Sequence, residues 1–454
     1  MSFYQEPAKR IPIREADVVV AGGGTGGVVA ALAAARRGAK TTLIEFKGYL
    51  GGTAVEGGTA LHSFYNLWKA FPGVEKRHIV RGIPQEMIDR LVAAGGCAGH
   101  AEMDSGYDYD SICTAIDTEI YKQVAFDMLE EAGVDICVNT FLAGAITEGG
   151  WVKGALAESH SGREAVMARC FVDCTGYGDL CAYAGAQFTE PNDYPVANSI
   201  GMAGVSMAGY REFMERNGAL VHIATDTRAG REGRIVRLQA DMNKLPEDFQ
   251  KVARAIGMAT VITTVHDDYF MFLKLNMKMP VSPTDRDAVA VAEAELRRRQ
   301  IRAVELFREY VPGCEQAFIT RTSPSLCIRR GRLITCDYDI TLDDVLEGRH
   351  FEDDVLTYGF HDSAPRLQIK NGGTYGIPYR ALTVAGIENL FATGMMITAD
   401  HDAHMSTRNT VSCMAQGQAA GTAAALCAAQ GCGTRALAYA DLRAALEEDG
   451  VYFE

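Results

Sequence analysis

The sequence has few of the features that mark exported or metal-binding proteins. Its 12 cysteines are scattered from Cys97 to Cys432, without a CxxC pair or a cluster with histidine, so we expect no zinc or iron–sulfur site. We interpret most of these cysteines as buried, reduced thiols. Residues 1–17 mix acidic and basic side chains before any apolar run, unlike a signal peptide, which predicts a cytoplasmic protein.

Positive charge is also in short supply. Lysine and arginine total 44 against 58 aspartates and glutamates, a net charge of −14, which argues against nucleic acid or an anionic membrane as a partner. The uncharged run 18–35 is as long as a membrane span, but five of its residues are glycines gathered in one turn. We therefore expect a strand, a loop and a helix there.

The composition is that of a globular protein. Of 454 residues, 48% are hydrophobic and 22% charged, which excludes disordered, collagen-like and coiled-coil chains. This length predicts two or three structural units. The sequence shows no internal repeat and no low-complexity linker.

A glycine-rich motif near the start predicts a dinucleotide site. A strand at 17–21 and a helix at 28–37 flank the GxGxxG glycines Gly22, Gly24 and Gly27. Such glycines allow a tight turn, a close backbone approach to a pyrophosphate and close helix–strand packing, while the helix N-terminus attracts the phosphates. A second strand, 40–44, ends at Glu45, whose carboxylate can accept both ribose hydroxyls and would repel a 2′-phosphate.

Further glycine-containing segments favour FAD over NAD. Gly52-Thr53 follows the acid, a strand at 171–173 leads into a second glycine turn near mid-chain, and a third strand, 389–394, precedes a small-residue helix at 417–425. These segments predict one dinucleotide fold assembled from the beginning, middle and end of the chain. An NAD dehydrogenase does not need such an arrangement. The predicted cofactor-binding residues are Gly22, Gly24, Thr25, Gly27, Glu45, Gly52, Thr53, Thr175, Gly176, Asp179, Gly394, Ser412 and Gly417.

With these segments in place, the sequence resembles the FAD-dependent oxidoreductases of the glutathione-reductase-like FAD fold. The resemblance covers nearly the whole chain and is carried by residues 18–27, 81–86, 173–180, 312–314, 329–332, 377–380 and 417–421. It implies an α/β protein with non-covalently bound FAD. A Rossmann-like FAD-binding domain of glutathione-reductase type would comprise 1–61, 118–186 and 338–454. An inserted α+β substrate domain would comprise 62–117 and 187–337.

Two positions depart from the family pattern. The third strand leads into Thr393-Gly394-Met395, where the family commonly has Ala-Gly-Arg, and Tyr177 stands where an aspartate is common. Neither change removes a predicted FAD contact. A mechanism in which that arginine holds an anionic substrate is not carried over.

The segment 399–408, between the third strand and the last helix, contains the predicted catalytic residues. The resemblance places this stretch near the flavin, and His401, Ser406 and Arg408 match its pattern. We predict that His401 or His404 is the acid/base and that Arg408 holds a substrate oxygen or the flavin O2 side. Alternatively, the histidines only brace the loop. A metal bound by His401, Asp402 and His404 is not expected, because a flavin already supplies the redox centre.

Other candidates have less support from their context. Arg329 and Arg332 either face the site or pair with Asp337 and Asp339. For Tyr375, Tyr379 and Arg380, we expect core packing, although a tyrosine there could donate a proton. His62, Tyr65 and Trp68 could line the pocket, and His361-Asp362 is an isolated pair. In a predicted helix at 284–310, the run Arg297-Arg298-Arg299 is interpreted as a solvated face.

These observations favour a FAD-dependent oxidoreductase that transfers hydride between flavin N5 and a small polar organic substrate, in either direction. The chain has no second GxGxxG, so we expect an external electron acceptor or donor; a homo-oligomer is left open. One alternative is a non-redox role like that of thiazole-forming relatives, with Cys174, Cys181 or Cys413 as a reactive thiol. Another is a flavin-bearing partner subunit.

Overall fold

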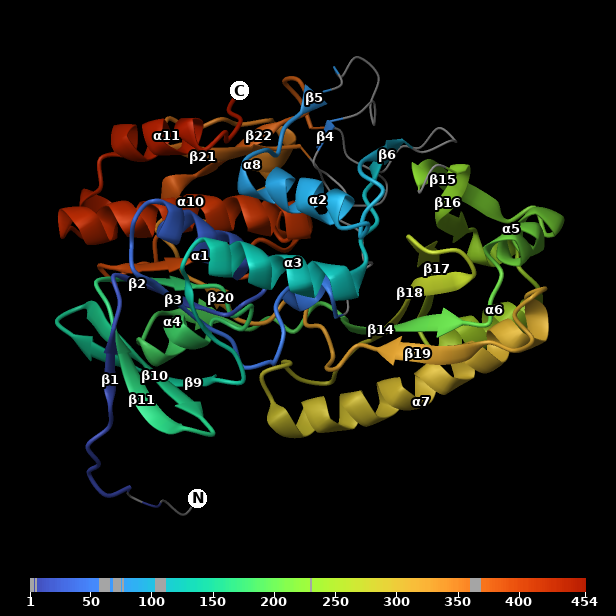
Figure 1. Ribbon diagram of the computed structural model, residues 1–454, viewed down its shortest axis with the longest axis horizontal. Helices are drawn as coiled ribbons and strands as arrows, with labels where there is room; N and C mark the ends of the chain where they lie inside the picture. The colour runs from blue at the N-terminus through green and yellow to red at the C-terminus, as the bar shows by residue number, and fades with distance from the viewer. Residues whose placement is uncertain are drawn as a thin grey trace.

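The computed structural model describes residues 4, 6–56, 66–67, 75, 77–102, 112–228, 231–359 and 369–454. The candidates His62, Tyr65, Trp68, His361 and Asp362 lie outside the described residues. Figure 1 shows two lobes, one built around a parallel sheet and containing both chain ends, the other built from the middle of the chain.

The first lobe is centred on a parallel sheet of five strands in the order β23-β12-β2-β3-β8. Its central strand β2 is completely buried, as expected for a strand covered on both faces. The predicted α/β class with a parallel sheet is confirmed. The strands are β2 (Val18–Ala21), β3 (Thr41–Ile44), β8 (Asp135–Cys137), β12 (Cys170–Asp173) and β23 (Leu390–Ala392).

Two helices from opposite ends of the sequence cross at unusually short range. In α1 (Thr25–Arg36) and α10 (Thr410–Gln430), most residues are buried, and alanine and glycine predominate. A Cβ at Gly417 would lie 2.2 Å from the carbonyl oxygen of Gly26, and one at Gly421 would lie 2.1 Å from that of Ala30. Glycine is therefore required along this seam, which fixes α10 against the start of α1.

The same lobe contains a second sheet and further helices. The strands β1 (Ile13–Glu15), β9 (Phe141–Glu148), β10 (Trp151–Ser159) and β11 (Gly162–Met167) form a second sheet, and α4 (Asp179–Tyr183) packs on β9. Helix α3 (Thr118–Glu131) begins at Asp117, whose carboxylate accepts from the backbone of Glu119 at 2.9 Å. Helix α2 (Ile83–Ala93) packs against α1, α3 and α10.

The second lobe has its own hydrophobic core. Six antiparallel strands run in the order β15-β16-β17-β18-β14-β19, covered by α5, α6 and α7. Tyr210, Phe270 and Phe307 pack with ring centroids 5.4 to 5.6 Å apart. The elements are β14 (Val196–Ala203), α5 (Met207–Arg216), β15 (Leu220–Arg228), β16 (Arg231–Ala240), α6 (Glu247–Ala255), β17 (Met258–Thr263), β18 (Tyr269–Met277), α7 (Arg286–Tyr310) and β19 (Phe318–Thr322).

The remaining elements are short. Helix α2 joins the core of the first lobe, although it lies within 62–117, a segment assigned above to the substrate domain. The domain boundaries given above therefore stay a prediction. The short elements are β4 (Asn66–Leu67), β5 (Arg77–His78), β6 (Ala101–Glu102), β7 (Ile112–Cys113), β13 (Phe188–Thr189), β20 (Leu333–Ile334), α8 (Leu342–Leu346), β21 (Asp354–Tyr358), β22 (Tyr375–Pro378), α9 (His401–Thr407) and α11 (Tyr439–Glu448).

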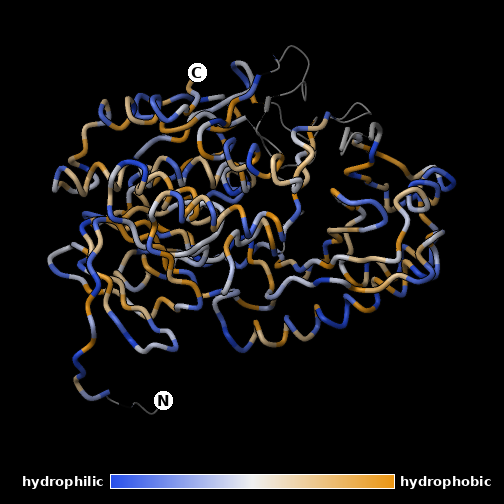
Figure 2. Tube along the Cα trace, viewed as in Figure 1, coloured by the Kyte–Doolittle hydropathy of each residue, from blue (hydrophilic) through white to orange (hydrophobic). Residues whose placement is uncertain are grey.

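The structure of helix α7 corrects the interpretation of Arg297-Arg298-Arg299 as a solvated face. It starts after Asp285, whose side chain accepts from the Ala288 amide at 2.8 Å, and Figure 2 shows hydrophobic and hydrophilic residues alternating along it. Only Arg298 of the arginine run is largely solvent-exposed. Arg297 donates to the Thr322 hydroxyl at 2.7 Å and Arg299 to the Asn276 carbonyl at 3.0 Å, so both tie the helix to the sheet.

In the portion of the chain described here, none of the helices has both the length and the apolar character needed to cross a membrane.

Candidate functional site

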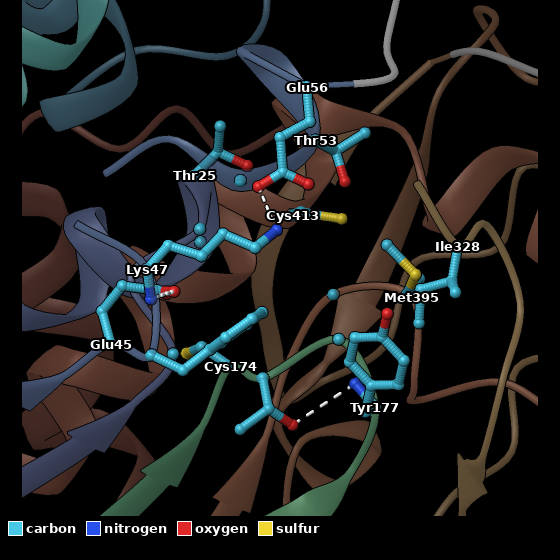
Figure 3. Close-up of a pocket in the computed structure, with 18 of the residues that line it drawn as sticks. Thr25, Glu45, Lys47, Thr53, Glu56, Cys174, Tyr177, Ile328, Met395 and Cys413 are labelled. Carbon is cyan, nitrogen blue, oxygen red and sulfur yellow. Dashed lines mark hydrogen bonds and ion pairs between the residues drawn. The ribbon is translucent and has the colours of Figure 1, made fainter. Parts of the chain in front are cut away.

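A cavity opens at the carboxyl ends of β2, β3, β12 and β23, where parallel sheets commonly bind ligands (Figure 3). Ten of the thirteen predicted cofactor-binding residues line it: Gly22, Gly24, Thr25, Glu45, Gly52, Thr53, Thr175, Gly176, Asp179 and Gly394. The structure therefore brings together segments that are more than 300 residues apart in sequence. Gly27, Ser412 and Gly417 are not among the lining residues.

The glycines of the turn differ in the space that a side chain would have. A Cβ at Gly24 would meet only the Cα of Gly52, at 4.0 Å, so this glycine leaves room on the cavity side. Gly22 has a φ of +95°, and a Cβ at Gly27 would lie 1.8 Å from the Gly22 carbonyl oxygen. The N-terminus of α1 has no side-chain cap, which leaves its amides available for phosphate oxygens.

Gly417 and Ser412 pack against residues of the cavity wall and do not line the cavity themselves. Gly417 holds α10 against Gly26 in the glycine turn. Ser412 is completely buried, and its hydroxyl accepts a hydrogen bond from Gln416, 3.1 Å away. Gln416 in turn accepts from the Gly394 amide at 2.7 Å, so both residues support the walls without lining them.

Glu45 lies at the end of β3 as predicted. One of its carboxylate oxygens accepts from the Gly23 amide at 2.6 Å and the other from the Lys47 amide at 2.9 Å. Burial raises the pKa of Glu45, and these two N–H groups oppose that rise. The carboxylate is thus held in one orientation between the glycine turn and the next loop.

The middle glycine segment is held by a buried carboxylate. Asp173, at the end of β12, accepts from the amides of Thr175 at 3.0 Å and Cys181 at 2.9 Å. Arg332 bonds to the Asp179 carboxylate at 2.7 Å and the Tyr177 carbonyl at 3.0 Å. Arg332 therefore pairs with a residue of the cavity wall, in agreement with the first of the two alternatives given above, that it faces the site.

Arg408 lines the cavity, as do Met395 and Cys413. Its guanidinium donates to the Tyr194 hydroxyl at 2.9 Å and lies 4.9 Å from that ring's centroid. The guanidinium of Arg329 lies 4.8 Å from the same centroid. Two positive charges thus surround one tyrosine next to the cavity.

His401 lies beside this tyrosine but does not itself line the cavity. Its ring centroid is 6.1 Å from that of Tyr194, and its Nδ1 is 2.8 Å from the Asp193 carboxylate. The other oxygen of Asp193 is 3.0 Å from Nε of the buried Arg330. His401 therefore belongs to an Asp–His pair that is joined to Arg330 through Asp193.

His404 has a different environment. It is completely buried, and its Nε2 donates to the Met395 carbonyl oxygen at 3.0 Å. Its Nδ1 has no hydrogen-bond partner among the described residues. Burial, reinforced by the charges of Arg408 and Arg330, places the pKa of His404 well below its ordinary value, so the ring is neutral.

Two tyrosines suggested as minor candidates belong to the core, as favoured above. The Tyr375 hydroxyl bonds to Ser406 at 2.6 Å, and that of Tyr379 donates to the Thr434 carbonyl at 2.7 Å; neither residue lines the cavity. Ser406, which matches the family pattern, therefore braces β22. The described residues contain no group of three metal-ligating side chains.

Sequence reasoning missed Tyr194, Lys47 and Glu56. The ammonium of Lys47 forms an ion pair with the buried carboxylate of Glu56 across the cavity wall, and Tyr49 donates to the same carboxylate at 2.8 Å (Figure 3). No motif marks these residues, although Lys47 lies between Glu45 and the turn Gly52-Thr53, and Glu56 follows that turn closely.

A family model for FAD-dependent oxidoreductases matches residues 17–446. A search of curated proteins gives no match. Among solved structures, a geranylgeranyl bacteriochlorophyll reductase-like protein from Thermoplasma acidophilum is 14% identical with a TM-score of 0.49, over 96% of this chain and 83% of the other. A myxobacterial chondrochloren halogenase is 12% identical with a TM-score of 0.48, over 95% and 78%. The p-nitrophenol 4-monooxygenase of Pseudomonas putida DLL-E4 is 12% identical with a TM-score of 0.44, over 97% and 84%.

The parallel sheet, the glycine turn at a helix N-terminus and the acid at the end of the next strand define a dinucleotide-binding α/β protein. The chain belongs to the FAD-dependent oxidoreductase family, and FAD is its cofactor.

Proposed function

We propose that the cavity holds FAD in the arrangement of the glutathione-reductase type. Its fit rests on the open cradle at Gly24 and on the uncapped N-terminus of α1, which suit a diphosphate. Glu45 would hold the ribose hydroxyls, while Thr175, Gly176 and Gly394 would border the remainder of the cofactor. FAD, when bound, supplies hydride transfer at its N5 atom.

We further propose that the protein oxidises or reduces a small polar organic molecule in the part of the cavity that Arg408 lines. The single observation that supports this most is the pair of guanidiniums, Arg408 and Arg329, around Tyr194. Charged donors of this kind bind and orient a substrate oxygen. Tyr194, whose hydroxyl is bonded to Arg408, also lies beside His401, with the two ring centroids 6.1 Å apart.

Of the two histidines, we propose His401 as the acid/base, because its Nδ1 lies 2.8 Å from the Asp193 carboxylate, which can orient the imidazole. His404 is then a positioning residue, since its neutral ring holds the Met395 carbonyl oxygen at the cavity wall. An external electron donor or acceptor would complete the cycle.

The first experiment is to purify the protein, record its visible spectrum and identify the cofactor released on denaturation. We expect a yellow protein that releases FAD. Polar organic compounds would then be added anaerobically to find those that bleach the flavin band. With such a compound, His401→Ala should slow bleaching by about 100-fold and flatten its pH profile. Full activity in His401→Ala would contradict the acid/base assignment, and a colourless protein that cannot be reconstituted with FAD would contradict the cofactor site.

A further inference from the structure

The loop between β3 and the turn Gly52-Thr53 contains an ion pair that is not part of any motif. The side chains of Lys47 and Glu56 both line the cofactor cavity, and they are only 16% and 5% exposed. Figure 3 shows Lys47 extended along the cavity toward Glu56, with Thr25 and Thr53 on the same side. Lys47 thus reaches the neighbourhood of the α1 N-terminus, where a diphosphate is expected.

The carboxylates of the described cavity wall differ in their hydrogen-bond and ion-pair partners. Glu45 is held by two backbone amides, and Asp179 is paired with Arg332. Among the described residues, Lys47 is the one cationic partner of Glu56, which also accepts from the hydroxyls of Tyr49 at 2.8 Å and Ser325 at 3.5 Å. If Lys47 left, these two hydroxyls would still donate to the Glu56 carboxylate.

The diphosphate of FAD brings two negative charges into the same space. Lysine suits such a ligand because its ammonium is a compact charge on a flexible stem that can reorient. Charge-assisted hydrogen bonds to phosphate are also among the strongest that a protein makes. The Glu56 carboxylate and the diphosphate are therefore competitors for one ammonium group.

We propose that Lys47 is a further cofactor-binding residue, which exchanges its ion pair with Glu56 for the diphosphate when FAD binds. Glu56 then lowers FAD affinity, because its ion pair must be broken first. Its main-chain carbonyl, which accepts from the hydroxyls of Ser199 and Ser323 in the second lobe, keeps the residue in place during this exchange.

The proposal predicts opposite effects of the two substitutions on the dissociation constant of FAD, measured by flavin fluorescence during titration of the apoprotein. Lys47→Met should weaken FAD binding by about 10-fold, and Lys47→Arg should restore most of it. Glu56→Gln should tighten binding by about 10-fold. The same signs are expected with ADP, which contains the diphosphate but no flavin, whereas adenosine binding should not change.

The exposed pair Lys370–Glu347, at 2.6 Å and far along the sequence, provides matched controls. Lys370→Met and Glu347→Gln should leave the FAD dissociation constant unchanged. Parallel weakening by Lys47→Met and Glu56→Gln would show that the pair only stabilises the loop, and unchanged binding in Lys47→Met would equally overturn the proposal. If Lys47→Met fails to fold, the sign of the Glu56→Gln effect decides. Since only cofactor binding is measured, the outcome is independent of the proposed reaction.

Discussion

At the scale of single residues, the two glycines of the phosphate turn carry different constraints. Gly24 faces open space, whereas a Cβ at Gly27 would overlap the Gly22 carbonyl oxygen. We therefore expect Gly24→Ala to fold with an unchanged melting temperature and to bind FAD about 10-fold more weakly, because a methyl group enters the cradle. Gly27→Ala should lower the free energy of unfolding of the apoprotein by about 1–3 kcal/mol. Thermal melts with flavin titrations test both, and equal loss of stability in the two variants would contradict this distinction.

The cavity thiols provide a second test at this scale. Burial raises the pKa of both Cys174 and Cys413 to about 12, so both are protonated at neutral pH. We expect iodoacetamide to modify them at least about 100-fold more slowly than a free thiol at pH 8. Cys174→Ser and Cys413→Ser should each retain FAD. Rapid modification of either residue, detected by mass spectrometry, would instead support the alternative with a reactive cysteine.

At the scale of elements, the α1–α10 seam is the feature most sensitive to a small addition of volume. Gly417→Ala and Gly421→Ala should each cost about 1–3 kcal/mol, because neither helix backbone can move away inside a packed core. Gly417 touches the glycine turn at Gly26, whereas Gly421 touches Ala30 one turn later. Only Gly417→Ala should therefore also weaken FAD binding, as measured by titration at a temperature where both variants are folded. An equal effect of both on FAD binding would contradict this prediction.

The comparison of sequence and structure is clearest for these same elements. Local patterns predicted the buried strands and the glycine turn, because β-branched runs and glycines act within a few residues. They placed the start of α1 three residues too late, since Gly26 and Gly27 suggested a loop although the seam requires them within a helix. The Tyr194 cluster could not be predicted, because Arg329 and Arg408 meet that ring only after both lobes have folded.

At the scale of the whole molecule, buried histidines should make stability depend on pH. Burial lowers the pKa values of His78, His100 and His404, that of His100 to about 4. The unfolded chain binds protons near 6.5, so below that pH it takes up more protons than the folded protein and stability is lost; above it, the contribution is complete. We expect a loss of up to about 1.4 kcal/mol per histidine for each pH unit below 6.5.

Urea unfolding at several pH values between 8 and 5 would measure this slope. His100, whose ring nitrogens contact Thr114 at 2.8 Å and Gln85 at 2.9 Å, is the most direct test. His100→Gln should reduce the slope, whereas His160→Gln, at an exposed position, should leave it unchanged. A slope that persists in His100→Gln would assign the acid sensitivity to other groups.

The order of the central strands has a consequence for how the protein is made. Strand β12 lies between β2 and β23, and β23 begins only at Leu390. During synthesis, a ribosome has to complete most of the chain before β12 gains its second neighbour, and until then the growing chain presents an unpaired sheet edge. Cys413 and the seam on α10 emerge later still, so the cofactor cavity cannot close on a partial chain. Premature termination would therefore yield an aggregation-prone fragment without a flavin site.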